Sequence, residues 1–315
     1  MKKSNVKKAH HFPVRLMGCG FVLTAVHESS QVAWDALRAG KSEIERIEKL
    51  ISSWKDDSQT TAINEASGER AVSVDRELFN LIERSVKVSS LTQGAFDISG
   101  TLSRYYWKFD KQDHSLLSKA SIDKLVSLID YTNIILNKAE SSIMLRKKGM
   151  KIGFGGIGKG YAAEQAKEIM QKHGIQDGLV NASGDLIAWG NPPQAEIWDI
   201  SIPDPKNRAF NLLSLSIENG SVVTSGSYEN YTVIDGKRYS HIINPRSGYP
   251  VTHTKNVTVV CPNAEFGDAL ATALSVLPIE EGIGLTNRLA GVECIIIDAY
   301  DQPHFSNLLK TKAYA

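Results

Sequence analysis

The stretch GLVNASGDLIAW, residues Gly178–Trp189, carries apolar residues on both sides of a polar centre and predicts strand structure. Further apolar segments bounded by turn residues surround it, so strands come in runs in this half of the chain. They are expected at Ser142–Leu145, Ile197–Ile202, Leu212–Ile217, Val222–Thr224, Val257–Cys261 and Val292–Asp298. Runs of strands, in place of a regular strand–helix alternation, indicate an α+β fold with mixed, largely antiparallel sheets and packed helices.

Helices are predicted mainly in the first half of the chain. Gln31–Ile51 carries Leu and Ile at helical spacing between charged residues, after a short strand at Phe21–Val26. Further helices are expected from Ser73 or Asp75 to about Leu91, and over Ser118–Asp130, Gly160–His173 and Gly267–Leu277. No segment has the composition of a linker. We therefore expect a flexible N-terminus over residues 1–12 and a single domain over residues 13–315.

Composition and charge exclude several classes of function. The 315 residues are 42% hydrophobic and 23% charged, as in ordinary globular proteins. The 36 basic and 35 acidic side chains nearly cancel, so no overall field favours nucleic acid or an anionic membrane as a partner. We also find no apolar stretch long enough for a membrane span.

The cysteines carry little functional signal. They lie at positions 19, 261 and 294, with no spacing typical of a zinc site or a redox pair. Leu16–Cys19 matches the short consensus that precedes a lipidated cysteine, but no apolar run of about 7–15 residues stands before it. We therefore expect a cytoplasmic protein, with a periplasmic location as the alternative if the chain has been shortened.

The segment Gly153–Gly160, GFGGIGKG, precedes a helical pattern and is suited to bind phosphate. Glycines let the backbone approach a phosphate closely, and a helix N-terminus adds free N–H donors. The G-x-G-x-x-G dinucleotide fingerprint is satisfied, but the flanking βαβ units are missing. The G-x-x-x-x-G-K-[ST] loop fails because Gly160 stands where a hydroxyl is needed. A glycine-rich turn with a purely structural role is the simplest alternative.

Hydroxyl, imidazole and carboxylate groups gather in the last third of the chain. Thr224–Gly226 and His241–Pro250 concentrate them around tight turns, which often carry function. Asp268 and Thr272 are four residues apart, so they share one face of the predicted helix. Both offer hard oxygen ligands suited to Mg²⁺. Alternatively, Asp268 is a helix cap and His241 an ordinary strand histidine.

With these motifs in this order, the chain resembles the ApbE-type FAD:protein FMN transferase family over nearly its whole length. The matching segments are Met17-Gly18, Trp54, Ser58–Asn64, Gly94–Asp97, Gly155–Tyr161, Asn181–Asp185, Thr224–Gly226, His241–Pro250 and Asp268–Thr272. The resemblance implies an ApbE-like fold and transfer of the FMN half of FAD to a Thr or Ser hydroxyl of a target flavoprotein, with release of AMP. The implied metal is Mg²⁺ or Mn²⁺, and the implied partners are FAD and the acceptor flavoprotein.

The resemblance also assigns roles to individual residues. Asp268 and Thr272 match the metal-binding side chains, and Gly158 matches a residue whose backbone carbonyl completes the metal site. The residues implied in FAD binding are Met17, Trp54, Phe96, Asp97, Lys159, Glu164, Ser225 and His241. Gly153 departs from the family pattern, because relatives often carry an acidic residue there.

A hydroxyl nucleophile needs a base that accepts its proton near neutral pH. His241 fits by its titration range, and Asp268 is the alternative because it lies beside the implied metal. Lys159 would add positive charge at the phosphates. Two assignments stay open: Trp54 is either partly buried or stacked on the flavin, and Asp97 either caps a turn or binds substrate.

Other functions compete with transfer. A pyrophosphatase would hydrolyse FAD to FMN and AMP if water reached the metal, and a non-catalytic FAD-binding protein would need the pocket without Asp268 and Thr272. The hypothesis of a nicotinamide-dependent oxidoreductase is supported only by the G-x-G-x-x-G match. Asp57–Ile63 is close to the acceptor pattern of these transferases, but Ile63 stands at the modified position, so the chain cannot flavinylate itself there.

Overall fold

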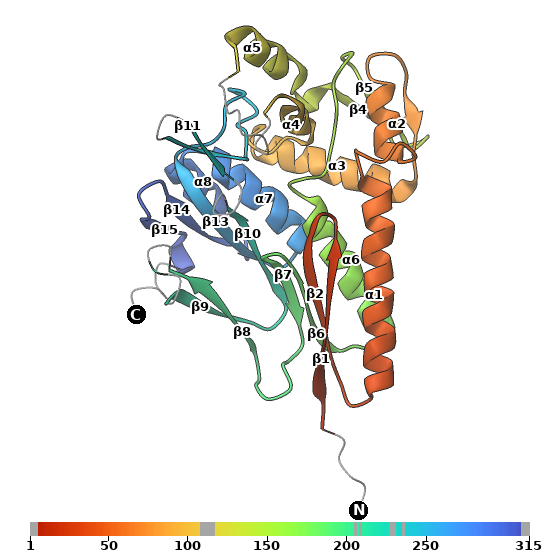
Figure 1. Ribbon diagram of the computed structural model, residues 1–315, viewed down its shortest axis with the longest axis vertical. Coiled ribbons are helices and arrows are strands. Elements are labelled where there is room, and N and C mark those ends of the chain that lie inside the picture. The colour runs from red at the N-terminus through yellow and green to blue at the C-terminus, as the bar shows by residue number, and fades with distance from the viewer. Residues whose placement is uncertain are drawn as a thin grey trace, which may run out of the picture.

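The computed structural model describes residues 6–107, 117–204, 207, 210–226, 231–234 and 237–309. Its centre is an eight-stranded sheet in which all neighbouring strands are antiparallel (Figure 1). In spatial order the strands are β1 (Lys8–Leu16), β2 (Cys19–His27), β6 (Asp177–Ala182), β7 (Asp185–Trp189), β10 (Gly220–Gly226), β13 (Thr254–Cys261), β14 (Glu293–Asp298) and β15 (Pro303–Phe305). The prediction of an α+β fold with largely antiparallel sheets is confirmed.

Three small sheets flank the main one. Their strands are β3 (Val72–Ser73), β5 (Ser142–Leu145) and β4 (Ile134–Asn137) in the first, β8 (Trp198–Pro203) and β9 (Asn211–Ile217) in the second, and β11 (Tyr231–Ile234) and β12 (Lys237–Ser240) in the third. The β8–β9 ribbon covers part of the main sheet, because its apolar residues share a buried cluster with Leu186, Val222 and Ile295.

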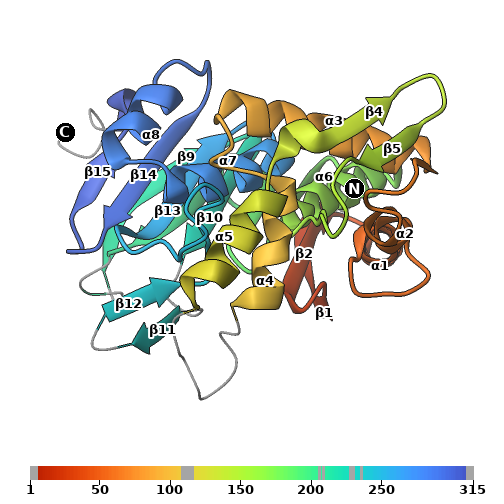
Figure 2. The ribbon, with the colours of Figure 1, turned by 90° about the horizontal axis from the view of Figure 1, so that it is seen from above.

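The described part of the chain contains eight helices, and only some of them cover the other side of the main sheet. The eight helices are α1 (Ser30–Ile51), α2 (Gln59–Glu65), α3 (Arg76–Leu91), α4 (Ser103–Tyr106), α5 (Lys119–Leu128), α6 (Gly158–Lys172), α7 (Ala264–Val276) and α8 (Ile279–Thr286), with 3₁₀ turns η1 (Ile98–Leu102) and η2 (Tyr131–Asn133). As Figures 1 and 2 show, α7 packs on β10 and β13, α6 lies beside α7, and α1 packs on the outer side of α6. None of the described helices is long and apolar enough to cross a bilayer.

The crossing of α6 and α7 depends on Gly160. A Cβ at this position would lie 2.1 Å from the carbonyl oxygen of Ala264 and 2.9 Å from Cβ of Asp268. Only a residue without a side chain allows this approach. The crossing brings the glycine-rich segment, which leads into α6, against residues of α7 that lie more than a hundred positions later in the chain.

Two sequence predictions need correction. Residues 8–12, expected to be flexible, pair with β2 as the first half of β1, and Phe12 packs against the main core; the many polar residues of the segment hid this alternation. The stretch Gly178–Trp189 is two strands, β6 and β7, because Ser183 and Gly184 adopt positive φ of 53° and 102° and turn the chain. Residues 1–5 lie outside the described part of the chain.

Candidate active site

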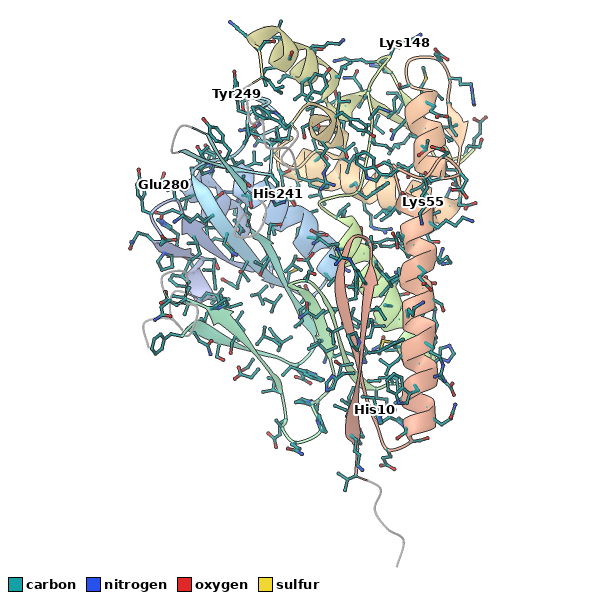
Figure 3. All side chains as sticks on the ribbon, in the orientation of Figure 1. His10, Lys55, Lys148, His241, Tyr249 and Glu280 are labelled. Atoms are coloured by element: carbon teal, nitrogen blue, oxygen red, sulfur yellow. The ribbon has the colours of Figure 1, made fainter. Side chains whose placement is uncertain are left out.

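A cavity of about 690 Å³ lies where the β6–β7 turn, the end of β10 and one face of α7 meet. Five residues expected at the site line it, namely Lys159, Ser225, His241, Asp268 and Thr272. His241, labelled in Figure 3, comes from the segment after β12 and lies near β10, β13 and α7. The fold therefore gathers glycine-rich, turn and helix motifs from distant parts of the sequence.

Asp268 is held in a fixed orientation at the crossing of the two helices. It is 2% exposed, and its Oδ2 accepts a hydrogen bond from the backbone N–H of Gly160 at 3.1 Å. It does not cap α7, since that role belongs to Asn263, which accepts from the N–H of Phe266. The helix-cap alternative for Asp268 is therefore wrong, and its carboxylate faces the cavity from inside the helix.

Thr272 lies one helical turn after Asp268 and against the glycine-rich turn. A Cβ on Gly156 would lie 2.8 Å from Thr272 Oγ1, so the turn passes close to this hydroxyl. Ser275 and Thr286 donate their hydroxyl protons to carbonyls four residues back, at 2.8 and 2.9 Å. In the part of the chain that the structure describes, the hydroxyl of Thr272 has no such partner, so its oxygen is available to a ligand in the cavity.

The donor set at Asp268 and Thr272 fits a hard divalent cation. A carboxylate, a hydroxyl and a backbone carbonyl are oxygen ligands of the kind that Mg²⁺ and Mn²⁺ prefer. Gly158 is the first residue of α6, two positions before the N–H that binds Asp268. Within the described residues no group of three His, Cys, Asp or Glu side chains could hold a metal. A site of this kind would therefore depend on Asp268, Thr272 and backbone oxygen.

Lys159 is already paired with a buried carboxylate that the sequence did not single out. Its Nζ forms an ion pair with Asp185, which is fully buried and also accepts from the N–H of Thr224 at 3.2 Å. The same Nζ lies 3.8 Å from Oδ1 of Asp268. Asp185 ends the matching segment Asn181–Asp185, directly after the β6–β7 turn, but this position gives no indication of its pairing with Lys159.

A second cavity, of about 110 Å³, adjoins the first. Both are lined by Gly155, His241, Ile242 and Thr272, so these four residues lie at the junction. Phe96 and Asp97 line the small cavity and stay outside the lining of the large one. The two cavities together bring most of the expected residues to one continuous site.

Asp97 caps a turn and also lines the small cavity. Its carboxylate accepts from the N–H and hydroxyl of Ser99, at 2.8 and 2.7 Å, and from the N–H of Tyr131 at 2.8 Å. Burial raises the pKa of Asp97 despite these hydrogen bonds. Of the two roles expected for Asp97, the structure shows the turn cap, and it places this cap in the wall of the small cavity.

His241 lies outside any strand. β12 ends at Ser240, and the chain then forms a turn closed by the Ile243–Pro250 bridge. The N–H of Val251 donates to the carbonyl of Ile242 at 2.9 Å, which fixes the base of this turn. The strand-histidine alternative for His241 is therefore wrong, and the side chain reaches both cavities from a turn.

Four expected residues lie apart from the linings of these two cavities, namely Met17, Trp54, Gly158 and Glu164. Trp54 is 62% exposed and stacks on Tyr105 with ring centroids 5.3 Å apart. Met17, with φ of 51°, lies beside the start of α6, since a Cβ on Gly158 would be 3.6 Å from its Cε. Its neighbours Gly18 and Cys19 line the large cavity.

Glu164 faces away from the site. Its Oε1 accepts from the backbone N–H of Ala264, the first residue of α7, at 2.5 Å. Burial raises its pKa, and this hydrogen bond lowers it by a smaller amount. Glu164 lines a separate groove with Arg84 and Phe266. The structure therefore gives Glu164 a role in docking α7 on α6, where the sequence had implied contact with FAD.

The comparison with protein families decides between the interpretations of these motifs. Residues 17–296 match the model of the ApbE family. The chain belongs to the ApbE family. The match covers the glycine-rich turn, the His241 segment and the Asp268–Thr272 pair. The family predicted from sequence motifs is therefore confirmed.

Two relatives of this chain carry the same name. A protein from Klebsiella pneumoniae named FAD:protein FMN transferase is 32% identical over 257 residues, 81% of this chain and 79% of that protein. A protein of the same name from Treponema pallidum is 29% identical over 269 residues, 81% of this chain and 74% of that protein.

Solved ApbE structures agree with the fold. The crystal structure of the ApbE protein from Thermotoga maritima is 27% identical and superimposes with a TM-score of 0.88, covering 96% of this chain and 99% of that one. The apo flavinyl transferase ApbE from Pseudomonas stutzeri, 23% identical, gives a TM-score of 0.86 over 98% of both chains. At this identity the second comparison supports the fold alone.

Proposed function

We propose that this protein transfers the FMN half of FAD to a Thr or Ser hydroxyl of an acceptor flavoprotein and releases AMP, with Mg²⁺ or Mn²⁺ as the metal. The observation that carries the proposal is the meeting of Asp268, Thr272 and the glycine-rich turn at the junction of two cavities in a member of the ApbE family. A nicotinamide-dependent oxidoreductase, the hypothesis based on the G-x-G-x-x-G fingerprint, would leave Asp268 and Thr272 without a role.

The proposed reaction exchanges one ester oxygen for another at the FMN phosphorus. The acceptor hydroxyl oxygen forms a bond to this phosphorus, and the bond from the phosphorus to the bridging oxygen breaks. AMP leaves with the bridging oxygen and the electron pair of the broken bond. The hydroxyl proton passes to a base on the protein. In the competing hydrolysis, water takes the place of the acceptor hydroxyl, so access of the two nucleophiles decides the product.

The residues present suit this reaction. A metal bound by Asp268, Thr272 and the carbonyl of Gly158 would neutralise charge on the diphosphate and on the departing AMP. Gly160 holds the carboxylate of Asp268 in place through its N–H. The hydroxyl oxygen of Thr272 lies against the glycine-rich turn, where backbone N–H groups can contact phosphate.

His241 is the base that the geometry favours. It lies at the junction of the cavities on a turn, and imidazole titrates near neutral pH. Asp268, the alternative base, is buried, accepts a hydrogen bond from Gly160 and lies 3.8 Å from the ammonium group of Lys159. Its carboxylate is already engaged by these two groups, and the proposal assigns it to the metal.

The chain itself is a poor acceptor at its acceptor-like segment. Ile63 is 1% exposed and lies in α2, so neither a hydroxyl nor an extended substrate conformation is present there. A separate acceptor flavoprotein is therefore part of the proposal. The enzyme must work in the compartment that contains this acceptor. A cytoplasmic location stays a prediction from the sequence.

The test is a product assay with FAD, Mg²⁺ and an acceptor fragment. We expect the acceptor to gain the mass of FMN less water, with one AMP released per adduct. A fragment with Ala in place of the hydroxyl residue, and a reaction with chelator, are the controls. AMP without adduct would replace the proposal with the pyrophosphatase. FAD binding without either product would leave a non-catalytic flavin-binding protein.

A further inference from the structure

The cation expected at the phosphates is already neutralised. Lys159 forms an ion pair with the buried Asp185 and lies 3.8 Å from Asp268. The negative charge of these two carboxylates exceeds the single positive charge of the Lys159 ammonium group. A diphosphate that enters the cavity therefore needs positive charge from a further source, in addition to a bound metal.

Arg104 lies directly against the glycine-rich turn. A Cβ on Gly155 would be 2.8 Å from Nη2 of Arg104 and 3.1 Å from its Cζ. Arg104 belongs to α4 and lines the small cavity, while Gly155 lines both cavities. The guanidinium group thus lies beside the backbone that is suited to hold phosphate.

Arg104 has no carboxylate partner among the described residues. No ion pair or hydrogen bond of its guanidinium is found there. Arg104 is an exposed residue, and the desolvation of its guanidinium by the surrounding protein lowers its pKa, with no neighbouring charge to offset the effect. Because no carboxylate among the described residues pairs with this guanidinium, an arriving anion can bind it without breaking an ion pair.

We propose that Arg104 binds the diphosphate of FAD, as a second cation beside the glycine-rich turn in addition to Lys159. The inference rests on the proposed function, because it takes FAD as the ligand. Guanidinium presents a planar pair of N–H donors that match two phosphate oxygens, so Arg suits this role better than Lys. No sequence motif indicated this role, because Arg104 lies on a four-residue helix outside the recognised segments.

The experiment compares FAD and riboflavin binding, followed by flavin fluorescence, in wild type, Arg104→Gln, Arg104→Lys and Arg38→Gln. Riboflavin lacks phosphate, and Arg38 is an exposed residue of α1 paired with Asp35. We expect Arg104→Gln to raise the Kd of FAD by about tenfold or more, with the riboflavin Kd and Tm unchanged. Arg104→Lys should recover part of the loss, and Arg38→Gln should match wild type.

Several outcomes would overturn the inference. They are an FAD Kd within twofold of wild type in Arg104→Gln, an equal loss of riboflavin binding, or an Arg104→Lys variant no better than Arg104→Gln. Failure of the wild type to bind FAD at all would instead remove the proposed function. The two failures are therefore distinguishable in one set of titrations.

Discussion

The backbone N–H of Gly160 donates a hydrogen bond to Oδ2 of Asp268 at 3.1 Å, and this contact joins the glycine-rich segment to the helix that carries the candidate metal ligands. It exists because α6 and α7 cross at a distance that only glycine permits. Most of the site depends on this crossing, so its disruption should affect both stability and chemistry.

Gly160→Ala should destabilise the fold. The new methyl group would meet the backbone carbonyl of Ala264 at 2.1 Å, which cannot move without displacing α7. We expect a loss of about 1–3 kcal/mol or more in the free energy of unfolding, measured by urea denaturation. Gly284→Ala is the control, because its nearest neighbour is the end of Arg288 at 3.8 Å; Ala there should stabilise α8 slightly. Equal stability of both variants would contradict the packing argument.

Asp268→Asn should abolish metal-dependent transfer while leaving the fold intact. The amide oxygen can still accept from Gly160, but the negative charge is lost. We expect the rate to fall by about a hundredfold or more, with Tm close to wild type. Asp199→Asn removes an exposed carboxylate of β8 that is not part of the cavity lining, and it should leave the rate unchanged. Full activity of Asp268→Asn at saturating FAD would show that the metal site is wrongly assigned.

Thr272→Val should weaken metal binding. Valine keeps the shape of threonine but lacks the hydroxyl oxygen, and no described hydrogen bond is lost with it. We expect the Mn²⁺ concentration for half saturation to rise by about tenfold, measured by electron paramagnetic resonance with FAD present. Thr272→Ser keeps the oxygen and should stay near wild type. A Val variant that binds Mn²⁺ like the Ser variant would exclude the hydroxyl as a ligand.

His241→Gln should slow the chemical step without removing the substrate. A positioned general base contributes about 10²–10⁴-fold, so single-turnover adduct formation should slow within that range. FAD affinity, measured separately by fluorescence, should change by no more than a few fold. If FAD affinity fell as steeply as the rate, His241 would be a binding residue and the base would have to be sought elsewhere.

Glu164→Gln should change how stability depends on pH. Burial raises the pKa of Glu164 in the folded protein, so the folded state holds this proton more tightly than the unfolded state. Its contribution to stability is therefore lost as pH rises from the ordinary carboxyl value of about 4.3 through the raised pKa. As pH rises through that range, the unfolding free energy of the wild type should fall relative to that of the Gln variant. A difference between the two proteins that stays constant with pH would contradict this account.

Local sequence signals predicted the long elements well. Periodic Leu and Ile residues predicted α1 within one residue at its start. The start of α7 was predicted three residues late, at Gly267, because its cap Asn263 was not recognised. The single strand expected over Gly178–Trp189 was wrong because only two residues, Ser183 and Gly184, make the turn inside it. β1 was missed because its alternation becomes visible only when β2 and α1 provide a surface to cover.

Parts of the site that depend on packing between distant segments were not predictable from sequence. Asp185 pairs with Lys159 only because β7 and the start of α6 meet, and Glu164 turns toward Ala264 only because α6 crosses α7. Asp268 and Thr272 were found because their four-residue spacing survives in any helix. Arg104 had neither spacing nor motif, and only the fold brings it to Gly155.

The two helices at the crossing hold each other reciprocally, because α6 donates through Gly160 to α7 and accepts through Glu164 from α7. Binding at Asp268 and the docking of α7 on α6 are consequently linked equilibria. A ligand that fixes Asp268 also tightens the helix pair, and loosening the pair lowers the affinity for that ligand by the same free energy. A change in ligand affinity at the site should therefore be accompanied by a change in the stability of the α6–α7 packing.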